Sequence, residues 1–112
     1  MHTLPNAHLA IIPIEKLRDY SLSLEHRRGR DKARVFRSAL GLNADNAEWL
    51  AEVIRLEVAK SPVKSILKNE YGLRFQVDFT VIHEGRSASV RTGWILPDGE
   101  IAPRLTTCFV VV

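Results

Sequence analysis

Four residues of this sequence are candidates for a site that exchanges protons and holds an anion: His26, Lys32, Arg91 and Thr107. Histidine titrates near neutrality and can act as a base or an acid. Arginine can bind a phosphate through two parallel hydrogen bonds, and the ammonium and hydroxyl groups can bind its other oxygens. Cleavage of RNA without a metal needs such a set, because a base must take the 2′-hydroxyl proton, cations must stabilise the pentacoordinate phosphate, and an acid must protonate the leaving 5′-oxygen.

The histidine and the lysine lie in the most cationic part of the chain. Residues 26–37 hold six of the sixteen Lys and Arg residues, and such a cluster attracts polyanions through counterion release. The positive surroundings favour the neutral form of His26, which can act as a base. A solvated helix face is the alternative interpretation of the cluster. The arginines expected to bind RNA are Arg27, Arg28, Arg30 and Arg34.

Each candidate also has an ordinary structural interpretation. His26 can bond a loop carbonyl, and threonines are common in strands whatever their function. Ion pairs account equally well for the two cations, and exposed pairs contribute little to stability. The partners available for such pairs are Asp31 or Glu25 for Lys32, and Asp78 for Arg91.

The composition is that of a folded domain. The chain has 112 residues, a net charge of +3 and 46% hydrophobic residues, and this length sits near the modal domain size. No apolar run approaches the ~20 residues of a membrane helix and no signal peptide is visible, so we expect a cytoplasmic protein without membrane contact. The single Cys108 excludes an internal disulfide. No His/Asp/Glu spacing suggests zinc, so neither a metal nor a cofactor is expected.

The first half of the chain has the spacing of helices, and the second half has that of strands. Helical periodicity with start and stop signals predicts helices over residues 13–23, 31–40 and 46–60, after an extended lead-in over residues 4–12. Asp31 is the predicted N-cap of the second helix, and Asp45 with Glu48 resembles a capping box for the third. Alternation of period two predicts strands over residues 75–81, 88–96 and 104–112, after a short strand-like piece over residues 63–67.

These elements predict an α+β fold in which two or three N-terminal helices, over about 13–60, pack on one face of a C-terminal antiparallel sheet. The sheet has about four strands, over about 63–112, and residues 1–112 form a single domain. Strand parity places Arg91 on the face away from the helices and Trp94 in the core. Either Thr106 or Thr107 joins the outer face, depending on the register. An ordinary solvated face is the alternative to a binding surface.

Several short motifs together resemble a known family. The first half contributes Leu4-Pro5-Asn6-Ala7, then Lys16-Leu17-Arg18-Asp19-Tyr20, then His26, Gly29 and Lys32-Ala33; the second half contributes Arg91-Thr92-Gly93-Trp94 and Pro103-Arg104-Leu105-Thr106-Thr107. The combination resembles a small bacterial family classed as a domain of unknown function, over nearly the whole chain. The sequence departs from the pattern at Ser21 and Leu22, where paired leucines are usual, and in the tail after Thr107.

The layout of this family looks like that of the Barnase–EndoU–Colicin–RelE group of metal-independent ribonucleases, which act as toxins. The resemblance implies a toxin-like endoribonuclease that cleaves RNA by 2′-hydroxyl attack, with His26, Lys32, Arg91 and Thr107 as catalytic residues. It also implies RNA as substrate and a cognate immunity or antitoxin protein as a possible partner. The alternative is a non-enzymatic partner-binding module of such a toxin system. The oligomeric state and the RNA sequence cleaved stay open.

Overall fold

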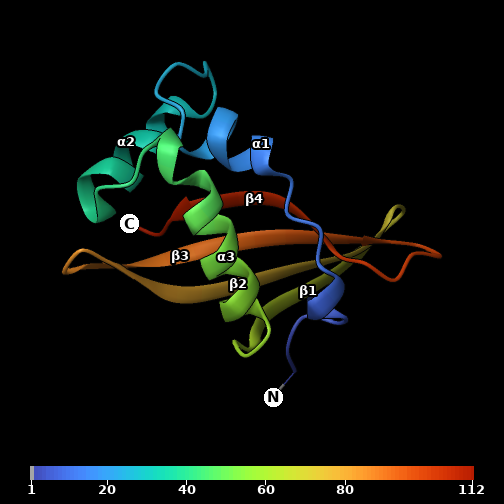
Figure 1. Ribbon diagram of the computed structural model, residues 1–112. Coiled ribbons are helices and arrows are strands. Elements are labelled where there is room, and N and C mark those ends of the chain that lie inside the picture. The colour runs from blue at the N-terminus through green and yellow to red at the C-terminus, as the bar shows by residue number, and fades with distance from the viewer. Residues whose placement is uncertain (1) are drawn as a thin grey trace.

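The computed structural model describes residues 2–112. Four antiparallel strands form one sheet in chain order, and all helices precede them in the chain (Figure 1). The predicted α+β class is therefore confirmed. The helical elements are η1 (Ala7–Leu9), α1 (Ile14–Lys16), η2 (Leu17–Ser21), α2 (Arg30–Leu40), η3 (Ala44–Asn46) and α3 (Ala47–Val58). The strands are β1 (Val63–Asn69), β2 (Gly72–His83), β3 (Arg86–Pro97) and β4 (Arg104–Val110).

The first predicted helix is shorter and less regular than expected. α1 is a single turn, and η2 continues it as a π-helical turn in which the Leu22 N–H donates to the Leu17 carbonyl at 2.8 Å. The extra residue in a π-turn rotates the residues that follow it relative to an α-helix. As a result Leu17 and Ser21 are buried while Leu24, which the α-helical spacing places with Leu17, is 41% exposed.

The predicted caps of the other two helices are wrong, although the helix positions are close. α2 begins at Arg30, so Asp31 lies inside its first turn rather than at the N-cap. α3 begins at Ala47, and the capping box before it joins Asn43 and Asn46 instead of Asp45 and Glu48. At the end of α2 the prediction holds, because Gly41 adopts a φ of +68° that favours glycine.

One face of the sheet carries the core, as the alternation predicted. Side chains from β2 and β3, including Phe75, Val77, Val90 and Trp94, pack against α2 and α3. Trp94 is 1% exposed, and its indole N–H donates to the buried hydroxyl of Thr92 at 2.9 Å. α3 crosses this face, while α1 and α2 lie toward the β4 edge (Figure 1). Within residues 2–112 no helix has the length and apolar character needed to cross a membrane.

A β-bulge in β4 decides the choice between the two threonines. Thr107 pairs with Gly93, whereas the next pair along the ladder joins Leu105 to Trp94, so Thr106 is the extra residue. Leu105 and Cys108 are buried in the core, and both threonines are half-buried. Both line the hollow on the outer sheet face. The structure thus brings both threonines to that face, where the sequence predicted only one.

Candidate functional site

His26 holds the turn that leads into α2. The backbone N–H groups of Arg28 and Gly29 donate to His26 Nδ1 at 3.0 and 3.1 Å. A side-chain acceptor that takes the second and third N–H groups after it is an N-cap in its hydrogen bonding. The imidazole therefore does the capping that was predicted for Asp31, and it accepts backbone N–H groups rather than bonding a carbonyl.

This arrangement fixes the tautomer of His26. Because Nδ1 uses its lone pair to accept two N–H groups, the proton of the neutral ring must sit on Nε2. A base acting through Nε2 would need the opposite tautomer, whose Nδ1 proton would point at the two backbone N–H groups. The predicted role of His26 as a general base is therefore not supported by the geometry, and the ring presents an N–H donor instead.

Gly29 brings this turn against Tyr20. A Cβ added at Gly29 would lie 2.2 Å from the Tyr20 carbonyl oxygen and 2.8 Å from its carbon, so only glycine allows the approach. The rings of His26 and Tyr20 then contact each other with centroids 4.5 Å apart. Tyr20 was not among the predicted site residues, and it belongs to the π-helical turn η2, a distortion found frequently at functional sites.

Lys32 is the centre of the candidate site. Its ammonium donates to Thr107 Oγ1 at 3.2 Å, and it lies 5.6 Å from the centroid of the Tyr20 ring and 5.0 Å from that of Phe109. Both rings attract the cation through their faces. The predicted alternative, a pair with Asp31 or Glu25, is wrong, because Asp31 pairs with Arg34 and Lys32 reaches across to β4.

A cavity of about 260 Å³ opens beside this ammonium group. Its lining consists of Lys16, Tyr20, Ser21, Lys32, Leu105, Thr106, Thr107 and Cys108. Among the described residues 2–112, two lysines and no carboxylate line it, so it favours an anion, and its volume is large enough to take a phosphate group. The three hydroxyl-bearing residue types in the wall can supply hydrogen bonds to such an anion.

Arg91 does not reach this cavity. It lies on the outer sheet face, as predicted, and forms a bidentate pair with Asp78 at 3.0 and 3.1 Å. Lys64 bonds the same carboxylate at 3.2 Å. Partial burial alone would raise the pKa of Asp78, but the bonds from Arg91 and Lys64 outweigh it and hold that pKa below its ordinary value. The pair with Asp78 that the sequence offered as an alternative is therefore present.

The predicted RNA-binding arginines form an exposed rim around the turn before α2. Arg27, Arg28, Arg30 and Arg34 are all exposed. Only Arg34 has an acidic partner among the described residues, at 3.4 Å from Asp31, where both side chains are largely solvated. Lys32 belongs to the same turn and helix as these arginines. One segment of the chain therefore contributes both the cationic rim and a lysine of the anion cavity.

The family comparison agrees with the sequence motifs. A family model described as a domain of unknown function (DUF6883) matches residues 3–112. The chain belongs to this family. No curated protein and no solved structure gives a significant match to the chain.

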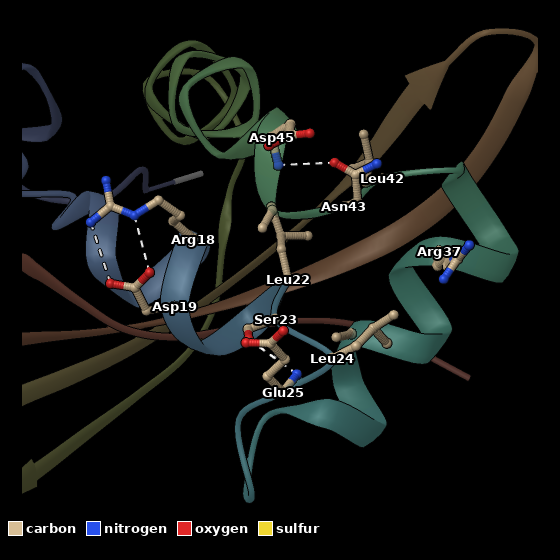
Figure 2. Close-up of a pocket in the computed structure, with 12 residues that line it drawn as sticks. Arg18, Asp19, Leu22, Ser23, Leu24, Glu25, Arg37, Leu42, Asn43 and Asp45 are labelled. Atoms are coloured by element: carbon tan, nitrogen blue, oxygen red, sulfur yellow. Dashed lines mark hydrogen bonds and ion pairs between the residues drawn. The ribbon is translucent and has the colours of Figure 1, made fainter.

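A larger hollow of this DUF6883 domain lies on the other side of η2 and is a poorer anion site. It measures about 380 Å³ and is lined by residues of η2, the following loop, α2 and η3 (Figure 2). Two arginines face three carboxylates in its wall, and Arg18 bonds Asp19 at 3.0 Å. These charges offset one another. The size of this hollow favours it as a binding site, but the net positive lining favours the smaller cavity at Lys32. We regard charge as decisive for a polyanion.

The thiol at the back of the small cavity is inert. Cys108 is buried, and burial raises its pKa to about 12, although the nearby Lys32 charge acts in the opposite direction. A thiol protonated at neutral pH is a poor nucleophile. No group of three or more His, Cys, Asp or Glu side chains within residues 2–112 is placed to hold a metal ion.

The DUF6883 motifs thus contribute residues to one site, but the residues that meet there are not the four that the sequence predicted. Lys32 and Thr107 meet directly, and His26 joins them through the Tyr20 ring. Arg91 lines a neighbouring hollow on the outer sheet face, which Thr106 and Thr107 also line. The residue missed by sequence reasoning is Tyr20. Its signal was its place at the end of the Lys-Leu-Arg-Asp-Tyr motif.

Proposed function

We propose that this protein is a toxin-like endoribonuclease that holds the RNA backbone at Lys32 and cleaves it by attack of the 2′-hydroxyl. The observation that carries the proposal is the Lys32–Thr107 bond of 3.2 Å in the wall of a cavity that, within residues 2–112, is lined by two lysines and no carboxylate. In this reaction the 2′-oxygen bonds to phosphorus and the bond to the 5′-oxygen breaks. The 2′-hydroxyl loses its proton and the 5′-oxygen gains one.

The residues divide the work as follows. The Lys32 ammonium stabilises the charge that develops on the phosphate oxygens. Thr107 accepts from Lys32, which leaves its own hydroxyl proton free to donate to an oxygen of the same phosphate. Tyr20 is the residue we assign as the proton donor to the 5′-oxygen, since it lines the cavity and contacts both the cation and His26. The 2′-hydroxyl proton passes to solvent water, from which the phenol is reprotonated. His26 acts as a positioning residue for Tyr20.

The exposed arginines support binding to a long polyanion. Arg27, Arg28 and Arg30 have no acidic partner among residues 2–112 and stand on the segment that carries Lys32. Binding to RNA through contacts of this kind weakens as the salt concentration rises, because each phosphate that an arginine neutralises releases counterions. Resemblance to ribonuclease toxins adds the expectation that the active protein harms the cell that makes it.

The test is cleavage of a short fluorescent RNA in a chelating buffer. We expect Lys32→Met and Tyr20→Phe each to lower the rate by about 10²–10³. Lys68→Met, which removes one exposed lysine from β1, is the matched control and should keep the wild-type rate. The same RNA with a 2′-deoxy sugar at the cleaved position should stay intact. A folded wild-type protein that leaves all RNA intact contradicts the proposal.

Two variants separate the roles of the imidazole. His26→Asn keeps a side-chain acceptor for the turn, whereas His26→Ala removes it and should cost about 1 kcal/mol of stability. If His26 only positions Tyr20, His26→Asn should cleave with a wild-type pH profile at a moderately reduced rate. A rate as low as that of Tyr20→Phe, with an altered pH profile, would instead assign direct chemistry to the imidazole.

A partner-binding module is the second candidate, and the β1 edge favours it. This strand is at the edge of the sheet, and its first residue, Val63, donates to the His2 carbonyl at 2.8 Å. Ile66 and Leu67 in the strand and Tyr71 in the turn after it are 52%, 66% and 67% exposed. An open strand edge with apolar side chains is a template for a strand from another chain. RNA that stays intact with a folded wild-type protein would favour this candidate over cleavage.

A further inference from the structure

A hollow on the outer face of the sheet adjoins the cavity at Lys32. It measures about 300 Å³ and is lined by residues of all four strands, which places it at the small end of ligand pockets. Thr106 and Thr107 line both this hollow and the Lys32 cavity, so the two spaces lie on either side of the bulge. Phe109 also lines the hollow, and its ring centroid is 5.0 Å from Lys32 Nζ.

Gly93 shapes the wall of the hollow at the bulge. A Cβ there would lie 2.7 Å from Thr107 Cγ2 and 3.3 Å from Thr106 Oγ1. Glycine inside a strand often marks a place where another group approaches the backbone closely. Here the approaching groups are the two threonines, so glycine at position 93 lets β4 present both of them in the wall of the hollow.

The chemistry of the wall differs from that of the Lys32 cavity. The Asp78 carboxylate satisfies Arg91 through a bidentate pair, so the guanidinium does not act as a free anion site. What remains is the Phe109 ring, the amide of Gln76, the hydroxyls of Ser65, Thr106 and Thr107, the Leu67 side chain and the exposed guanidinium of Arg74. The planar guanidinium is itself a group on which a base can stack. A flat, uncharged ring with hydrogen-bonding groups along its edge matches such a wall, because it can stack on Phe109 and pair with the amide.

We propose that this hollow is a nucleobase subsite, in which the base of a nucleotide stacks on Phe109 and is read by Gln76 while the adjacent phosphate lies at Lys32. This inference rests on the proposed function and adds to it that the protein recognises a base as well as the backbone. The threonine pair separates the two subsites by a single bulge, as neighbouring base and phosphate groups of one strand require.

The test measures binding without cleavage, using labelled tetranucleotides with 2′-O-methyl groups that cannot attack phosphorus. One tetranucleotide carries four bases, and the other has the same phosphates but only abasic sugars. In fluorescence anisotropy we expect the wild type to bind the base-bearing strand about tenfold more tightly, the effect of one stacked base. Phe109→Leu should remove this difference, so that the two strands bind with the same affinity.

Further variants keep the test decisive. Gln76→Met, which keeps the length of the side chain, should also weaken binding of the base-bearing strand only, and serves if Phe109→Leu fails to fold. Thr80→Val, an exposed change on the same strand and outside the hollow, should leave both affinities unchanged. Lys32→Met should weaken both strands by the same factor, because both carry the phosphate.

The outcomes separate this inference from the proposed cleavage. Equal binding of base-bearing and abasic strands overturns the base subsite, whether or not RNA is cleaved. Base-dependent binding that Phe109→Leu abolishes supports the subsite even if no cleavage is found. In that case only the proposed cleavage activity is contradicted. Failure to bind either strand overturns both.

Discussion

Replacing Gly29 by alanine tests whether close packing of the His26 turn on Tyr20 is needed. The new Cβ would lie 2.2 Å from the Tyr20 carbonyl oxygen, whereas ordinary contacts begin near 3.4 Å. Overpacking costs about 1–3 kcal/mol, and the upper end applies because backbone must move on both sides. Alanine returns about 0.4–1 kcal/mol by restricting the unfolded chain. We therefore expect a net loss of about 2 kcal/mol.

Gly85→Ala is the matched control for this prediction. Gly85 has a φ of +79°, which disfavours alanine, but nothing lies within 4 Å of the added Cβ. Its strain of about 1–2 kcal/mol is partly offset by the same gain in the unfolded chain. Gly29, with a φ of −89°, has no such strain. Backbone angles alone thus predict that Gly85→Ala is less stable than Gly29→Ala. Close packing predicts that Gly29→Ala is the less stable of the two.

Thermal and urea unfolding followed by circular dichroism measure both variants. For a domain of this size about 2 kcal/mol corresponds to a fall in Tm of about 8 °C. We also expect Gly29→Ala to weaken RNA binding, because the Tyr20 and Lys32 contacts depend on the same approach. A Gly29→Ala protein as stable as the wild type, or more stable than Gly85→Ala, would refute the reasoning.

Three further predictions follow from packing and charge. Gly93→Ala should lower the free energy of unfolding by about 1 kcal/mol, because its Cβ meets Thr107 at 2.7 Å; an unchanged urea midpoint would contradict this. The lowered pKa of Asp78 means that the unfolded state binds more protons near pH ~4, so stability is present above that pH and falls as pH drops further. Asp78→Asn should flatten this acid limb of a urea-unfolding series. Cys108, whose pKa is raised to about 12, should make stability fall as pH rises above about 8.5, where the unfolded thiol ionises, and Cys108→Ala should abolish that fall.

Short-range patterns predicted the fold well. Alternation of apolar and polar residues along β2 and β3 fixed which side chains face the core, and the structure agrees for Val77 and Trp94. Period-two patterning is informative here because one face of the sheet is covered by helices and the other is open. Periodicity predicted the buried residues of the first helix less well, because a π-turn rotates every residue after it.

The candidate site was only partly predictable, because its contacts join residues far apart in the chain. Lys32 meets Thr107 across 75 positions, and no local pattern near Lys32 reports that neighbour. The partner of Arg91 was visible as an option because Asp78 lies opposite it in the sheet register. The tautomer of His26 depends on two backbone N–H groups whose direction only the folded turn defines.

The paired threonines of β4 also constrain how the chain length can vary. Leu105 and Cys108 both point inward although three positions separate them, which a plain alternation does not permit. Deleting either Thr106 or Thr107 would restore the alternation with Leu105 and Cys108 both still facing inward, because the deletion removes the extra residue of the bulge. The strand can therefore lose one residue at this point without turning its core side chains outward, and such a deletion should instead remove one threonine from the wall of the hollow.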